Sequence, residues 1–298
     1  MLTIPRSQQA QLVDLADATI RGTLVGEHGV PEAANLFEAI GATVSTAFPA
    51  AADAWRSVLA PLGVTAKVIG AFSFGVPKVA FIDGGVAHRC DLAACLVIVD
   101  DQTAPVSDRR ALLLSLRRQA DPAPPGQGRL YAEWPAFRFA DTAYEAGSRD
   151  LRAAKGETNA CFAEIDLARK EPEWTLAEPC RSGGGRSRDS LGALLVAMVV
   201  GAGGRKAVAG GTDAWSQTVD DLLRSTARAT AGGLSRQSRV RSAATYKGEC
   251  GSGFVVVENR QDLPLDLALA KIVAQGDALP EGPISVVHVV LRRHGILN

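Results

Sequence analysis

One stretch constrains the fold of this chain more than any other, an apolar run from Cys90 to Val99 that is interrupted only by Asp91. Its side chains are apolar on both alternating faces, which is typical of a strand in the middle of a sheet covered on both sides. Such a sheet needs a layer on each face, and 298 residues with 47% hydrophobic content are enough to provide both. The run therefore predicts an α/β fold with a central sheet.

Apolar residues recur at helical spacing before this run and again in the C-terminal half. Expected helices cover residues 8–26, 32–44, 50–59, 189–200 and 265–274, and another begins at Thr212 or Asp213 with Trp215, Val219, Leu222 and Leu223 on its buried side. Expected strands cover residues 64–74, 78–83, 90–99, 164–166, 253–258 and 284–291. Residues 110–117 are expected to pair with the central strand, although their alanine and leucine content also fits a helix.

These elements predict a larger core and a smaller second part. Residues 1–140 hold the helical layer and a mixed central sheet from about Val64 to Phe139, and residues 141–298 form a mixed α/β part that completes or flanks it. An irregular hinge is expected at residues 121–128, where three prolines and two glycines interrupt regular hydrogen bonding. We therefore expect an α/β fold in which helices flank a mixed sheet.

Charge and cysteine content exclude several classes of protein. With 32 basic and 32 acidic residues the chain has no net charge, so contact with nucleic acid or anionic lipid needs a local patch. The five cysteines contain no Cys-x-x-Cys pair, which argues against a disulfide scaffold and a zinc ribbon. No apolar run approaches the ~18 residues of a membrane span, and the first 20 residues lack a secretory apolar region. We expect a cytoplasmic protein without membrane contact.

Three segments carry a resemblance to a known family. Residues 90–96 read CDLAACL, residues 110–117 read RALLLSLR and residues 129–135 read RLYAEWP. They resemble a group of bacterial proteins of the PD-(D/E)XK nuclease-like superfamily, which typically read Cys-Glu-Leu-(Gly/Ala)-Asp-Leu-Leu, then Ala-Leu-Leu-Leu-Gln-Ala-Lys, then Gln-Leu-Tyr-Leu-Tyr-x-Glu-Trp-Pro. Residues 189–205 and 213–216 are similar to the C-terminal half of such proteins. The resemblance implies a restriction-endonuclease-like core and a role in bacterial genome defence.

The resemblance also places a catalytic centre. Nucleases of this kind hold Mg²⁺ with acidic oxygens on neighbouring strands and stabilise phosphate charge with a cation. The family's metal-binding aspartate falls on Ala94, its glutamine on Ser115 and its lysine on Arg117. Because arginine cannot act as the neutral base that a lysine can become, even the retained cation is not equivalent. The resemblance therefore implies a nuclease fold with a degenerate centre.

Three acidic residues decide whether activity survives. Asp91 matches a neighbouring acidic position of the family, but it is one residue out of register and faces the opposite side of the strand unless the strand is bulged. In an active enzyme Asp91 and Glu38 would bind Mg²⁺. The alternative for Asp91 is an ion pair with Arg89 or Arg117. The alternative for Glu38 is a solvated position on the surface of its helix. Glu133 would shape the substrate cleft, or it belongs to a packing corner with the Trp-Pro pair that follows it.

The strongest local charge imbalance lies between Asp221 and Glu249, where no acidic residue occurs. The cations of this stretch are Arg224, Arg228, Arg236, Arg239, Arg241 and Lys247. Such a stretch can follow a phosphate backbone, or it can be a solvated, mobile loop.

Three functions stay open at this point. A degenerate nuclease-like module would bind DNA or RNA, or a partner subunit, without cleavage, and its binding would be sensitive to salt. An active enzyme would cleave with Mg²⁺, Asp91 and Arg117. A structural subunit would bind a protein partner, or another copy of itself, and no nucleic acid.

Overall fold

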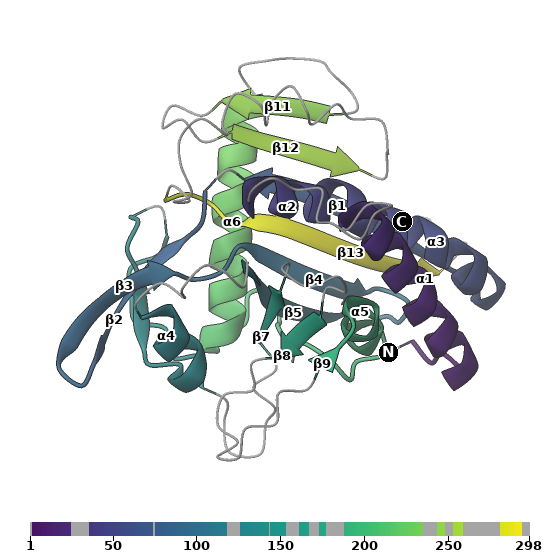
Figure 1. The fold of residues 1–298 in the computed structure, drawn as a ribbon, viewed down its shortest axis with the longest axis horizontal. Coiled ribbons are helices and arrows are strands. Elements are labelled where there is room, and N and C mark those ends of the chain that lie inside the picture. Colours follow the sequence, from purple (N-terminus) through teal and green to yellow (C-terminus); the bar gives the residue numbers. More distant parts are fainter. Residues whose placement is uncertain are drawn as a thin grey trace.

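The fold is described by a computed structural model for residues 2–24, 36–73, 75–117, 126–142, 144–152, 161–166, 173–176, 188–234, 243–247, 253–258 and 281–293. It confirms the expected α/β fold, in which a mixed central sheet is flanked by helices (Figure 1). The helix expected at residues 265–274 lies outside the described residues.

Ten described strands form the central sheet. Their spatial order is β11 (Ala243–Lys247), β12 (Gly253–Glu258), β1 (Val64–Ser73), β13 (Ser285–Arg293), β4 (Cys95–Asp101), β5 (Asp108–Arg117), β7 (Phe162–Asp166), β8 (Glu173–Leu176) and β9 (Arg188–Asp189), and β10 (Arg205–Lys206) pairs with β5. The pairs β13–β4 and β5–β7 are parallel and the others are antiparallel. The sheet therefore contains strands from both sides of residue 140, and β13 from the C-terminal side lies between β1 and β4 from the N-terminal side.

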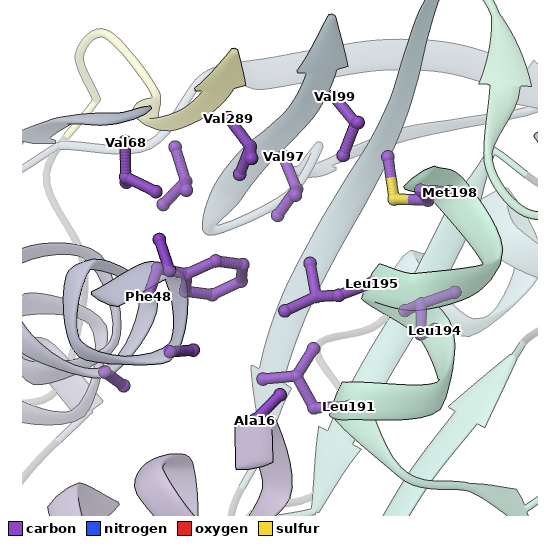
Figure 2. Close-up of a cluster of buried hydrophobic side chains, with 14 of the residues drawn as sticks. Ala16, Phe48, Val68, Val97, Val99, Leu191, Leu194, Leu195, Met198 and Val289 are labelled. Atoms are coloured by element: carbon purple, nitrogen blue, oxygen red, sulfur yellow. The ribbon is translucent and has the colours of Figure 1, made fainter. Parts of the chain in front are cut away.

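A layer of helices covers one face of this sheet. It consists of α1 (Arg6–Leu24), α2 (Leu36–Ala42), α3 (Phe48–Leu59) and α5 (Leu191–Val199), and the π-helical turn Thr43–Ala47 joins α2 to α3. Figure 2 shows Phe48 of α3 and Leu195 of α5 directed toward Val97 of β4 and Val289 of β13. The expected start of α5 is confirmed, because the Ser190 hydroxyl caps the helix by accepting a hydrogen bond from a backbone amide of the first turn.

The other face carries two helices and a second, smaller sheet. The layer consists of α4 (Gln127–Glu133), α6 (Ala214–Leu234) and the three strands β3 (Val86–Asp91), β2 (Lys78–Asp83) and β6 (Phe137–Phe139), in that spatial order. On α6, the expected inner residues Trp215, Val219 and Leu222 are fully buried against Leu96 and Ile98 of β4. Along β4 successive side chains thus alternate between the two cores, as the apolarity of the run predicted.

The expected single strand from Cys90 to Val99 is wrong in one respect, because the run is divided between two sheets. Its beginning belongs to β3 in the small sheet and its remainder to β4 in the central sheet. In the short link, the Leu92 amide donates to the Pro77 carbonyl and the Ala94 amide donates to the Leu114 carbonyl. Both sheets are buried here, so the link is as apolar as the strands that it joins.

The segment for which a helix was the alternative is strand β5. Within the described ranges, no helix has both the length and the apolarity to span a membrane.

Candidate functional site

The positions at which the resemblance places the catalytic centre do come together. Strands β4 and β5 are antiparallel neighbours with Cys95 opposite Leu114. The Ala94 amide donates a 2.9 Å hydrogen bond to the Leu114 carbonyl, which places Ala94 beside Ser115. Arg117 ends β5 and is paired in the backbone register with Asp166 of β7, while the side chains of both lie outside the description. Two of the three positions therefore form one locus at the junction of β4 and β5.

A tyrosine from α4 contacts Ser115, whereas the side chain of Ala94 packs on the other face of the sheet with Cys95 and Leu114. The Tyr131 hydroxyl donates a 2.6 Å hydrogen bond to the Leu92 carbonyl, accepts one of 2.9 Å from Gln127 Nε2 and shares another with Ser115. Burial raises the pKa of Tyr131 well above its ordinary value, so the hydroxyl stays protonated and remains a donor. Ala94, Ser115 and Tyr131 are all buried. The locus is a satisfied polar contact inside the core.

Asp91 lies at the end of β3 and is held in an ion pair. Its Oδ1 is 2.6 Å from Lys78 Nζ, and the two residues are opposite each other in the β2–β3 register. An ion pair was the expected alternative to metal binding, but its partner is Lys78, because Arg89 pairs with Glu281 instead. The neighbouring thiol of Cys90 has a pKa raised to about 12, mainly by burial and next by the Asp91 charge.

The described side chains do not fit a magnesium site at this place. In the part of the chain that is described, no three His, Cys, Asp or Glu residues are grouped so that they could hold a metal ion. Glu38 lies on α2, but its side chain is among those not described. Glu133 is exposed at the end of α4, and the next residue, Trp134, is fully buried against Phe162. The packing-corner interpretation thus holds for the tryptophan that follows Glu133.

The predicted cations are only partly described, and the two whose side chains are described lie on a helix. Arg224 and Arg228 are exposed residues of α6, so the loop interpretation is wrong at these two positions. Lys247 lies on β11, but its side chain is not described. Arg236, Arg239 and Arg241 lie outside the described residues. The helix continues because its apolar stripe packs against the core as far as the described side chains extend.

Arg224 and Arg228 line one pocket of about 110 Å³ on the surface of α6. The other lining residues are Thr142, Tyr144, Glu145, Asp221 and Ser225. Hydroxyl and guanidinium groups thus meet in one small concavity beside the carboxylates of Glu145 and Asp221, which both pair with Arg224, so the guanidinium that these two carboxylates do not hold belongs to Arg228.

A buried ion pair supports this pocket. Arg149 Nη2 is 2.6 Å from Asp221 Oδ2, and both side chains are buried. Arg224 is held between Asp221, at 3.4 Å, and Glu145 on the segment that leads to Arg149. Sequence reasoning missed Arg149 and Glu145 because the segment that contains them has no periodic pattern.

Comparison with protein-family models, curated proteins and solved structures finds no match for this chain. The resemblance to PD-(D/E)XK proteins therefore stays a prediction that rests on the residues quoted above.

Proposed function

We propose that this chain is a nuclease-fold protein that binds nucleic acid without cleaving it, within bacterial genome defence. The observation that carries the proposal is the burial of Ala94 and Ser115, the positions where the resemblance places a metal-binding aspartate and a glutamine: Ala94 packs among apolar residues on one face of the sheet, and Ser115 is bonded to Tyr131. A carboxylate pair on adjacent strands is what magnesium chemistry requires, and an alanine beside a tyrosine-bonded serine supplies none. The setting in defence follows from the resemblance alone.

Support for binding comes from the surface of α6. Arg224 and Arg228 project from consecutive turns of the helix, and the pocket that they share also presents hydroxyl groups. Arginine and hydroxyl groups are the side chains that most often contact phosphate oxygens. Because each such contact releases counterions, binding of this kind weakens steeply as salt is added.

The test measures binding and cleavage in the same samples of the full chain. A fluorescein-labelled DNA duplex, the corresponding single strand and an RNA strand are titrated at about 50 and 200 mM salt, and anisotropy is recorded. The samples are then incubated with Mg²⁺ or EDTA and analysed for shortened products. We expect salt-sensitive binding and intact nucleic acid under both conditions.

Two variants make this test specific. Arg228→Ala should weaken binding several-fold. Arg56→Ala should leave binding unchanged, because Arg56 is also an exposed arginine but lies on α3, which covers the opposite face of the sheet. Cleavage that needs Mg²⁺ would instead favour an active endonuclease that uses Asp91 and Arg117. The absence of any binding at low salt would favour a structural subunit that binds a protein partner.

A further inference from the structure

Strands β2 and β3 form a ribbon that projects from the body of the molecule (Figure 1). Their turn is made by Gly84 and Gly85, both with positive φ, as a two-residue hairpin turn requires. Strand β6 pairs with β2 only at Val79–Phe81. Beyond that point, from Ile82 to Ala87, no other described strand pairs with either edge. The end of the ribbon is therefore two strands wide.

The outward face of this ribbon carries small and apolar side chains, and arginines flank it. In the register, Ala80 lies between Arg89 of β3 and Arg138 of β6, and Ile82 lies opposite Ala87 toward the tip. All five residues are exposed, and Ile82 exposes 71% of its surface. Among the alternate positions, Val79, Phe81 and Cys90 are buried in the core. Two arginines whose Cα atoms are about 10 Å apart thus border a row of small and apolar side chains.

The charge that the ribbon presents to solvent is positive. On the face that alternates with Ile82, Asp83 and Arg129 of α4 form an ion pair in which the arginine side chain is 61% exposed and the aspartate 21%. Arg89 and Glu281 form another, in which the exposed fractions are 58% and 28%. In both pairs the cation projects and the anion is recessed. Arg138 has no ion pair with any residue in the described ranges. A ligand that approaches the ribbon therefore meets guanidinium groups first.

We propose that the β2–β3 ribbon enters the major groove of duplex DNA, an inference that rests on the proposed nucleic-acid binding and adds a second contact surface to that of α6. The major groove, about 12 Å wide, admits a two-stranded ribbon. Inside it, Ile82 contacts base edges such as thymine methyl groups, while Arg89 and Arg138 contact the phosphates on either side. The major groove of an RNA duplex is too narrow for this arrangement, so the ribbon discriminates against double-stranded RNA.

The experiment compares ribbon variants of the full chain on a labelled DNA duplex and an RNA duplex of the same sequence. The double variant Ile82→Glu/Val86→Glu puts two negative charges at the tip, where Val86 is also 57% exposed, so its thermal unfolding should match that of the parent chain. We expect it to bind the DNA duplex at least tenfold more weakly. Arg138→Ala should lower the slope of log affinity against log salt by about one, and Arg56→Ala should not change it.

Several outcomes would overturn the inference. If the parent chain binds DNA and the double variant binds it equally well, the ribbon is not the binding surface, although the proposed function stands. If the RNA duplex binds as tightly as the DNA duplex through the same residues, groove entry is wrong. If the parent chain binds neither nucleic acid, the proposed function and the inference both fail. Binding to phosphatidylserine vesicles that the double variant loses, without DNA binding, would assign the ribbon to a membrane surface.

Discussion

Replacement of Ala94 by aspartate tests whether the locus between β4 and β5 is a closed part of the core. Ala94 is buried, and burial can raise the pKa of a carboxyl group by several units. A rise from about 3.9 to about 7 would cost about 4 kcal/mol of native-state stability at pH 8. Because the unfolded chain then loses its proton at lower pH than the folded chain, this stability is lost as the pH rises from about 4 to about 7. Below that range the free energy of unfolding falls only by the cost of fitting and burying the neutral carboxyl group.

The assay is urea unfolding of Ala94→Asp at pH 5 and pH 8, with and without Mg²⁺. The matched control is Ala93→Asp, which places the same carboxylate at an adjacent buried position. We expect both variants to be destabilised more at pH 8 than at pH 5 and neither to be restored by the metal. If Mg²⁺ restored Ala94→Asp alone, the locus would be able to assemble a metal site. A loss for Ala94→Asp that did not depend on pH would show that position 94 is solvated, and our description of a closed centre would be wrong.

Three further perturbations test individual contacts in the fold. Tyr131→Phe should lower the free energy of unfolding by about 2 kcal/mol, since it removes a hydroxyl with three polar partners; chemical denaturation measures the loss, and an unchanged midpoint would contradict the network. The pKa of Asp100 is lowered to about 2, mainly by its interaction with His288, whose Nε2 lies 3.8 Å from Asp100 Oδ2, and also by hydrogen bonds that Ser107 and Gln102 donate, so its carboxylate should contribute about 2 kcal/mol above pH 4 that is lost as the pH falls toward 2; Asp100→Asn should flatten this acid limb in unfolding measurements, and an equally steep limb would refute the assignment. Gly192→Ala in α5 should be destabilising because its Cβ would lie 2.6 Å from a backbone oxygen of α1. Gly22→Ala, at a position of α1 where a Cβ meets no atom within 4 Å, should instead raise the melting temperature slightly.

The layers of this fold could be predicted from periodicity, but the division of its apolar run could not. The alternation of Leu96 and Ile98 with Val97 and Val99 showed correctly that a strand is covered on both faces. The change of sheet between Asp91 and Cys95 depends on hydrogen bonds to Pro77 and Leu114, which are set by tertiary pairing and leave no local signal. Hydrophobic pattern reports how deeply a residue is buried but not which sheet it joins.

The candidate sites show the same limit. Ala94 and Ser115 were placed side by side correctly, because two successive apolar strands usually pair. Tyr131, which occupies the locus, was quoted within the resemblance but was given no role. The ion pair of Arg149 with Asp221 joins residues 72 positions apart, and neither residue lies in a pattern that identifies the other. Contacts between distant side chains become visible only once the packing of the layers is known.

The position of β13 has a consequence for how this protein is made. This strand is the last described strand to be synthesised, yet it lies between β1 and β4. Until the ribosome has released it, the inner edges of β1 and β4 have no partner, and both are rich in valine and isoleucine. A nascent chain in this state exposes open strand edges, which are prone to pair with other chains. The sheet can therefore be completed only after β13 has been synthesised, and the unfinished chain depends on being kept from such pairing while it waits.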